Sequence, residues 1–208
     1  MTEPTEAEIE RAAEAAARGE LIVVPTDTVY GIGTRPDDPA ATARVFEAKR
    51  RPRALELPVL VPSPEAAERI ADLDDSARRL AERFWPGPLT IVVLRSAASA
   101  GWELGGNPET IGLRIPDHVV ALAVLRRAGP LAVTSANLSG HPTPATCDHV
   151  AALFGDAVSV TLCADAALSG RASTVVDVTT ATPVVLRPGA TPNVDIADVL
   201  PEVSIGPP

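Results

Sequence analysis

The chain carries, close to its beginning, the stretch Glu20-Leu-Ile-Val-Val-Pro25-Thr-Asp-Thr-Val-Tyr-Gly31. Its first half is a short apolar run, which is typical of a buried strand. Its second half, from Thr26 to Gly31, is polar and leaves the carboxyl end of that strand, where open α/β sheets bind their ligands. Taken alone, the polar half is better interpreted as an ordinary turn, in which Thr and Asp side chains hydrogen-bond to the nearby backbone.

The rest of the chain alternates predicted helices and strands. A capping box, Thr5-x-x-Glu8, opens an Ala-rich helix that Gly19 closes, and Asp38-Pro39 opens a helix that ends in Lys49-Arg-Arg51. Further helices are predicted at residues 64–71, 75–84, 117–128 and 146–154, and strands at 20–25, 58–61, 89–94, 110–115, 131–134, 159–162, 174–178 and 184–186. This order predicts an α/β fold, and the two closely spaced late strands indicate a mixed sheet. We expect a single domain over residues 1–200 and a loose C-terminal tail over residues 201–208.

The composition argues against several classes of protein. A hydrophobic content of 46% with a charged content of 22% is that of an ordinary globular protein rather than a disordered chain. The net charge of −9 disfavours a broad nucleic-acid-binding surface, because duplex binding depends on Lys and Arg that neutralise phosphates. The acidic N-terminus lacks the features of a secretory signal, and the apolar runs are too short to cross a bilayer. We therefore expect a soluble, cytoplasmic protein without membrane contact.

The cysteines and histidines do not form a recognisable metal site. Cys147 and Cys163 are not in a CxxC pair, and they are interpreted as small buried hydrophobic side chains in a reducing compartment. His118, His141 and His149 do not have the spacing of zinc ligands. We expect no structural metal.

A glycine-rich phosphate loop is also absent from the sequence. There is no GxxxxGK[ST] motif, and Gly31-Ile-Gly33 lacks the third glycine of a dinucleotide-binding fingerprint. If phosphates bind, basic side chains and hydroxyl groups must hold them. Lys49 and Arg51 could form such a phosphate clamp. Taken alone, they are better explained as charges that complement a helix dipole.

Polar or basic residues follow several later strands. Arg114 ends a predicted strand, and it either binds a carboxylate in a cleft or lies on the surface, with equal weight. Residues 134–140, Thr-Ser-Ala-Asn-Leu-Ser-Gly, suit contacts to ribose, adenine or phosphate, and equally an ordinary turn. Residues 173–177 and 186–189 repeat the pattern of a strand with a polar or basic end. None of these segments is specific by itself.

Seven such segments occur in a fixed order: PTDTVYG, KRRP, PGPLT, the strand from Thr110 to Arg114, TSANLSG, STVVD and LRPG. As a set they resemble the YrdC-like threonylcarbamoyl-AMP synthase family, in its short, single-domain type, from about Gly19 to Ala190. The resemblance implies a twisted open mixed sheet with flanking helices. It also implies a nucleotidyltransferase that forms threonylcarbamoyl-AMP and pyrophosphate from L-threonine, bicarbonate and ATP, for threonylcarbamoyladenosine modification of tRNA.

The resemblance assigns roles to individual residues. It places Thr26, Arg114 and Ser173 around L-threonine, with the Arg114 guanidinium on the carboxylate. It lines the ATP site with Lys49, Arg51, Thr110, Ser135, Asn137, Thr143 and Arg187. Within that set, Lys49 and Arg51 have the catalytic role of stabilising charge on the phosphates.

The resemblance also implies a cofactor and partners. Mg²⁺ accompanies ATP, and phosphates and water hold it rather than a protein cage. The product passes to a tRNA threonylcarbamoyl transferase, and a weak direct contact with tRNA stays open.

One departure and two rival functions accompany the resemblance. Leu55-Glu56 stand where many relatives carry proline or glycine, which leaves the shape of this loop open. One rival is an RNA-binding module of the same fold without catalysis, which the acidic net charge disfavours. The other is a different carbamoyl-adenylating enzyme, of the kind found in hydrogenase-maturation proteins, whose zinc-binding cysteine motifs are absent from this sequence.

Overall fold

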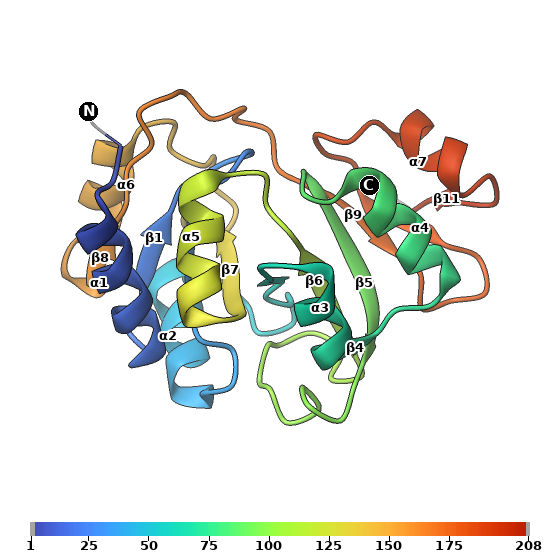
Figure 1. The fold of residues 1–208 in the computed structure, drawn as a ribbon, viewed down its shortest axis with the longest axis horizontal. Coiled ribbons are helices and arrows are strands. Elements are labelled where there is room, and N and C mark those ends of the chain that lie inside the picture. Colours follow the sequence, from blue (N-terminus) through green and yellow to red (C-terminus); the bar gives the residue numbers. More distant parts are fainter. Residues whose placement is uncertain (1–2, 207–208) are drawn as a thin grey trace.

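The computed structural model describes residues 3–206, and its centre is one mixed β-sheet that extends across the molecule (Figure 1). Its strands, in chain order, are β1 (Ile22–Val24), β2 (Gly31–Thr34), β3 (Val59–Leu60), β4 (Ala71–Asp72), β5 (Leu89–Arg95), β6 (Thr110–Arg114), β7 (Leu131–Ser135), β8 (Val160–Thr161), β9 (Thr174–Asp177), β10 (Val184–Arg187) and β11 (Ser204–Ile205). Their order in the sheet is β11-β10-β9-β5-β6-β3-β7-β2-β1-β8, and β4 pairs with β5. Parallel and antiparallel pairs both occur, so the predicted α/β fold with a mixed sheet is confirmed.

The helices flank this sheet, and all but the last helix begin within two residues of where the sequence predicts. They are α1 (Glu6–Ala17), α2 (Pro39–Lys49), α3 (Pro64–Ile70), α4 (Asp75–Phe84), α5 (Val119–Ala128), α6 (Cys147–Phe154) and α7 (Asn193–Val199), with a 3₁₀ turn at Gly155–Ala157. Both halves of the predicted capping box at Thr5 are present, and Gly19 follows α1 with a φ of 79°. Asp38 accepts hydrogen bonds from the first backbone N–H groups of α2.

The two faces of the sheet are buried differently. On one face, alternate residues of the central strands, such as Ile91 and Leu113, belong to the large hydrophobic core. The opposite face is covered at one end by α1 and α5, which lie side by side in Figure 1 and pack over β1 and β7 in a smaller core. In the centre of the sheet no helix covers this second face. A cavity lies there instead, and Thr90, Gly112 and Arg114 line it.

Strand β2 was not predicted, because two of its residues are glycines. Gly31 and Gly33 allow β2 to approach β7 closely. A Cβ at Gly31 would lie 2.5 Å from Val133 Cγ1, and one at Gly33 would lie 2.3 Å from the Ala132 carbonyl oxygen. The fold therefore requires glycine here for close strand packing.

The expectation of a loose tail is wrong for part of residues 201–208. Ser204 and Ile205 form β11, which pairs in parallel with β10 at the edge of the sheet. Val203, which precedes β11, packs against the large core. Residues 207 and 208 lie outside the described residues. Helix α7 was also missed by the sequence patterns.

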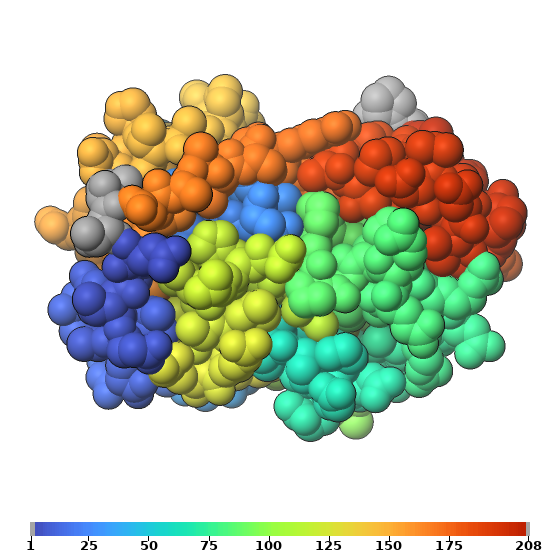
Figure 2. Space-filling view, turned by 45° about the horizontal axis from the view of Figure 1, so that its top comes forward, coloured from blue at the N-terminus to red at the C-terminus, as the bar shows by residue number. Residues whose placement is uncertain are grey.

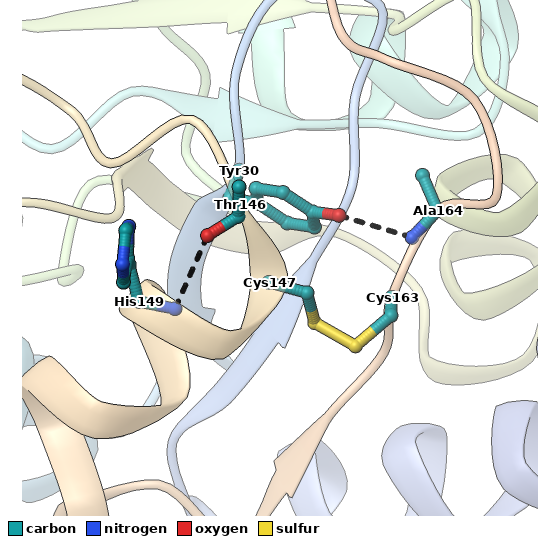
Figure 3. Close-up of a disulfide and its surroundings, with 6 residues drawn as sticks. All are labelled: Tyr30, Thr146, Cys147, His149, Cys163 and Ala164. Carbon is teal, nitrogen blue, oxygen red and sulfur yellow. Dashed lines mark hydrogen bonds between the residues drawn. A yellow bond between two sulfur atoms is a disulfide. The ribbon is translucent and has the colours of Figure 1, made fainter. Parts of the chain in front are cut away.

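The interpretation of the cysteines as separate buried side chains is also wrong, since Cys147 and Cys163 form a disulfide (Figure 3). Cys147 is the first residue of α6, and Cys163 comes two residues after β8. Figure 3 shows the Tyr30 ring beside the disulfide, with its hydroxyl oxygen accepting a hydrogen bond of 3.1 Å from the Ala164 backbone N–H. Spacing along the sequence did not reveal this pair because the tertiary fold brings the two residues together.

Beyond the disulfide, residues 164–173 form a strap that crosses from the α6 side of the molecule to β9 (Figure 2). The strap is hydrogen-bonded to the loop between β1 and β2. The Gly170 backbone N–H and the Ser169 hydroxyl both donate to the Thr28 carbonyl oxygen of that loop. It ends at Ser173, next to the first residue of β9. Within residues 3–206, no helix is long and apolar enough to cross a membrane.

Candidate functional site

A cavity of about 290 Å³ lies over the centre of the second sheet face. Strand periodicity explains its floor, because Thr90 and Val92 of β5 and Gly112 and Arg114 of β6 point to the same face. A Cβ at Gly112 would lie 3.3 Å from Thr90 Cγ2, so a side chain at Gly112 would crowd the floor. Six of the predicted site residues line this cavity: Thr26, Arg51, Arg114, Ser135, Ser173 and Arg187.

Arg114 anchors one end of the cavity and is 6% exposed. Its Nε donates to the Gly87 carbonyl oxygen at 2.9 Å, its Nη1 to Thr28 Oγ1 at 2.9 Å, and its Nη2 to Asp27 Oδ1 at 2.5 Å. Burial lowers the pKa of Arg114, and the Asp27 carboxylate opposes this shift. The guanidinium is thus a buried, rigidly oriented cation at the edge of the cavity.

Thr26 is both part of a local turn and part of the cavity lining. Its hydroxyl donates to the Val29 carbonyl oxygen at 2.6 Å and lies 2.9 Å from Thr28 Oγ1, which is the contact pattern of a local turn. The same residue lines the cavity beside Arg114. The hydrogen bonds of this turn therefore fix the loop that begins at Thr26, and this loop forms the cavity wall next to Arg114.

The other end of the cavity carries Arg51 and Arg187. Arg51 donates to the carbonyl oxygens of Leu55 and Glu56, and Arg187 donates to the carbonyl oxygen and the hydroxyl of Ser173. Within residues 3–206 neither arginine forms an ion pair with a carboxylate. Burial lowers the pKa of both arginines, and Arg187 contributes a further lowering at Arg51 because their charges are alike. Two cations without carboxylate partners favour an anionic ligand here.

Lys49 does not line the cavity but holds the loop that carries Ser135, which does. It is 1% exposed, and its ammonium donates to the carbonyl oxygens of Ser135 and Asn137 and to Asn137 Oδ1. Its own carbonyl oxygen accepts from the Ser139 backbone N–H at 2.9 Å. Burial, followed by the like charge of Arg51, lowers the pKa of Lys49 to about 7. Lys49 therefore ties the end of α2 to the loop after β7 and is not part of the cavity lining, whereas the family resemblance gives it a catalytic role at the phosphates.

Besides Lys49, three predicted residues lie apart from the cavity lining. Asn137 is engaged within its own loop, accepting from Ser135 Oγ at 2.6 Å and donating to the His141 carbonyl oxygen at 2.6 Å. Thr110 is the first residue of β6, at the opposite end of this strand from Arg114, and its hydroxyl donates to the Asn107 carbonyl oxygen. Thr143 is half-buried further along the loop that follows Asn137.

The lining and supporting residues that were not predicted include Asp27, Thr28, Glu56 and Thr90. Thr90 Oγ1 lies 2.9 Å from Ser173 Oγ and so joins β5 to the end of the strap. Its position in a strand of alternating residues was the signal that could have revealed it. Asp27 pairs with Arg114 across 87 residues of sequence, and no local pattern contains that information.

The charged arrangement suits a ligand with a carboxylate at one end and phosphates at the other. Mg²⁺ fits such a site without a dedicated cage, because this ion is commonly held by phosphates and water with one or two carboxylates. Among residues 3–206 no cluster of three or more His, Cys, Asp or Glu side chains could hold a metal. Glu56 is the one carboxylate among the described lining residues, so the cavity itself offers no set of protein ligands for the ion.

Comparison with known proteins gives consistent matches over nearly the whole chain. The Sua5/YciO/YrdC family model, described as telomere recombination, matches residues 14–189. A protein of Mycobacterium tuberculosis is 46% identical over 183 residues, which is 88% of this chain and 84% of that protein. The threonylcarbamoyl-AMP synthase of Pyrococcus abyssi is 39% identical over 191 residues, which is 91% of this chain and 56% of that enzyme.

A solved structure extends the match to three dimensions. The crystal structure of P. abyssi Sua5 complexed with L-threonine superimposes with a TM-score of 0.90 at 36% identity, covering 99% of this chain and 61% of that one. Because the family model covers well over half of the sequence and these relatives exceed 30% identity, the chain is a member of the Sua5/YciO/YrdC family.

Proposed function

We propose that this protein is an L-threonylcarbamoyladenylate synthase, which joins L-threonine, bicarbonate and ATP into threonylcarbamoyl-AMP and pyrophosphate. The observation that carries the proposal is one cavity with Arg114 at one end and Arg51 and Arg187, which lack carboxylate partners, at the other. Relatives named threonylcarbamoyl-AMP synthase support this reaction, and the threonine-bound P. abyssi structure supports the amino acid.

In the first step the amine nitrogen of threonine attacks the carbon of bicarbonate, and a carbamate forms with loss of water. Arg114 holds the threonine carboxylate through the N–H groups that its protein contacts leave unused. Its three hydrogen bonds fix the plane of the guanidinium before the substrate arrives. The protein holds the two reactants in the correct orientation, which lowers the entropic part of the activation barrier for bringing them together.

In the second step a carbamate oxygen forms a bond to the α-phosphorus of ATP, and the bond to the β-phosphate bridging oxygen breaks. Arg51 and Arg187 stabilise the charge that develops on the phosphates. Lys49 holds the loop that carries Ser135 against the same end of the cavity. Mg²⁺ bound to the nucleotide supplies further neutralisation of phosphate charge.

The carbamate oxygen is already an anion, so the attack requires no general base. In keeping with this, no histidine is among the described residues that line the cavity. We expect the adenylate to be passed on in the cytoplasm to a tRNA threonylcarbamoyl transferase, which uses it to modify tRNA.

Pyrophosphate release tests the proposed reaction. The purified protein is incubated with ATP, Mg²⁺, bicarbonate and L-threonine, and each component is omitted in turn. Release is expected to require both threonine and bicarbonate, and Arg171→Ala serves as the control because Arg171 is exposed outside the cavity lining.

A folded protein that releases no pyrophosphate but binds RNA in a salt-sensitive way would instead support the RNA-binding module. Release with carbamoyl phosphate in place of threonine and bicarbonate would support the other carbamoyl-adenylating chemistry.

A further inference from the structure

Glu56 is an acidic side chain in a basic cavity. Among the described residues that line the cavity it is the one carboxylate, and it shares the lining with Arg51, Arg114 and Arg187. Nothing in the proposed reaction uses it. A negative charge at this place would oppose the binding of a polyphosphate, so its presence requires an explanation.

The position of Glu56 is fixed by its backbone. Arg51 Nη2 donates to the Glu56 carbonyl oxygen at 2.8 Å, and the next residue, Leu57, donates its N–H to the Leu104 carbonyl oxygen at 2.8 Å. On the other side Gly106 packs so closely that a Cβ there would lie 2.8 Å from Glu56 Cβ. The backbone of Glu56 is therefore held beside Arg51, and its side chain contributes to the cavity lining, with Arg95 and Asp177 as the charges that act on the carboxyl group.

The surroundings of the carboxyl group disfavour its ionised form. Oε1 is covered and accepts no hydrogen bond within residues 3–206. Burial raises the pKa of Glu56 to about 7; Arg95 of β5 and the Gly112 backbone of β6 oppose the shift, and Asp177 of β9 adds to it. Arg95 directs its Nε and Nη1 to the carbonyl oxygens of Thr110 and Trp102, and among the described residues its Nη2 makes no hydrogen bond to Glu56 or to any other group, so its charge compensates the carboxylate only in part.

An anionic ligand in the cavity shifts this balance further towards the neutral form. Like charges at short range inside a cavity cost more than in water, and a proton on the carboxyl group removes the repulsion. A neutral carboxylic acid also gains a hydrogen-bond donor, which a phosphate oxygen can accept. The ionised carboxylate would repel the phosphates, whereas the protonated carboxyl group can donate a hydrogen bond to one of them.

We propose that Glu56 binds the polyphosphate of ATP as a neutral carboxylic acid, so that the protein takes up a proton when the nucleotide enters the cavity. This inference rests on the proposed use of ATP. Glu56 is then a substrate-binding residue whose protonation state sets the affinity for the nucleotide.

The direction of the pH effect follows from linkage. A group that is more protonated in the complex than in the free protein weakens binding as the pH rises. ATP affinity is therefore expected to fall between about pH 7 and pH 8.5, by up to about tenfold for each pH unit, since one proton is taken up at most. Below the pKa of the free protein the carboxyl group is already neutral, and affinity is expected to depend little on pH.

Calorimetry measures the proton directly. ATP is titrated into the whole protein at pH 7.5, without threonine, in two buffers of different ionisation enthalpy, and the difference in observed heat gives the protons taken up. Glu56→Gln keeps the shape and removes the titration. The wild type is expected to take up between about half and one proton, Glu56→Gln none from this source, and the ATP affinity of the variant is expected to be constant from pH 6.5 to 8.5.

Lys49 is the matched alternative, because it also titrates near neutral pH and supports the same end of the cavity. Proton uptake that persists in Glu56→Gln would assign the proton to Lys49 or to the nucleotide and overturn the proposal. A tenfold loss of affinity in Glu56→Gln for Mg²⁺–ATP but not for metal-free ATP would make Glu56 a metal ligand and also overturn it. No ATP binding by the wild type at any pH would instead contradict the proposed function.

Discussion

Arg114 and Arg187 stand at the two ends of one cavity, but their charges are balanced in different ways. Arg114 is held by a carbonyl oxygen, a hydroxyl and the Asp27 carboxylate, the last lying 16% exposed. Arg187 contacts the hydroxyl and carbonyl oxygen of Ser173 and no carboxylate. One end is a neutralised pair, and the other keeps its positive charge.

The difference indicates how each end can discriminate. A guanidinium has five N–H groups, and the three hydrogen bonds of Arg114 leave one on each terminal nitrogen, which suits a single carboxylate in one orientation. Arg187 and Arg51 offer net charge rather than a fixed geometry, which suits phosphates that carry several equivalent oxygens. The first end therefore selects by orientation, and the second attracts by charge.

Arg114→Ala is expected to have the largest effect. It removes the carboxylate contact and leaves Asp27 buried without its partner, which costs about 3 kcal/mol of unfolding free energy. We expect kcat/KM for threonine to fall by about 100-fold or more, with a smaller change in ATP affinity. Steady-state kinetics and denaturant unfolding measure the two effects. Equal losses for threonine and ATP would contradict the distinction between the ends.

Arg187→Ala should act on the other substrate. The loss of a hydrogen bond to a charged phosphate costs about 1.5–3 kcal/mol, so KM for ATP should rise between about tenfold and 100-fold. The threonine KM should change less than the ATP KM, since Arg187 forms no hydrogen bond with Arg114 or Asp27 and acts on Arg114 only through the like charge of the two guanidinium groups. Arg171→Ala, an exposed arginine of the strap, is the control for a general loss of positive charge. A larger effect on threonine than on ATP would reverse the assignment.

Asp27→Asn tests whether the neutralised pair matters as a pair. The amide oxygen can still accept from Arg114 Nη2, so the shape persists while the ionic part of the contact is lost. We expect a loss of about 1–2 kcal/mol in unfolding free energy and a rise of less than tenfold in the threonine KM. Thermal unfolding and kinetics provide the readings. No change in stability would mean that the pair contributes nothing to the fold.

Ser173→Ala should give the smallest effect and connect the two ends. Ser173 Oγ lies 2.9 Å from Thr90 Oγ1 and accepts from Arg187 Nη2 at 3.1 Å. The contact with Thr90 is lost, while Arg187 keeps its hydrogen bonds to the Ser173 carbonyl oxygen, so the cost is about 1 kcal/mol, which corresponds to roughly fivefold in kcat/KM. Because Ser173 lies between the ends, similar losses for threonine and ATP are expected. A loss confined to one substrate would assign Ser173 to that end alone.

Helix starts were predictable because their signals are local. Thr5 with Glu8, and Asp38 with Pro39, place the required acceptors within a few residues of the N–H groups that they cap. Strand β2 was not predictable, since Gly31 and Gly33 are needed only because β7 lies against them. Propensity contains no information about such a tertiary contact.

The candidate site shows the same limit. The positions of Arg114 and Arg187 at strand ends follow from alternation, so their presence in the cavity was predictable from pattern and family resemblance. The pairing of Arg114 with Asp27 was not, because 87 residues separate them. The use of Lys49 to bind the loop after β7 was likewise hidden, since its oxygen acceptors belong mainly to the backbone.

The Cys147–Cys163 disulfide gives the protein a natural labelling site. The chain contains two cysteines and both are in this bond, so a thiol-reactive dye finds no target until the bond is reduced. Reduction then frees two thiols, of which Cys147 is buried in the large core and Cys163 is partly buried just before the strap that ends at Ser173, so Cys163 is the one to label. A fluorophore attached there reports movement of the strap in the wild-type sequence, without any engineered cysteine.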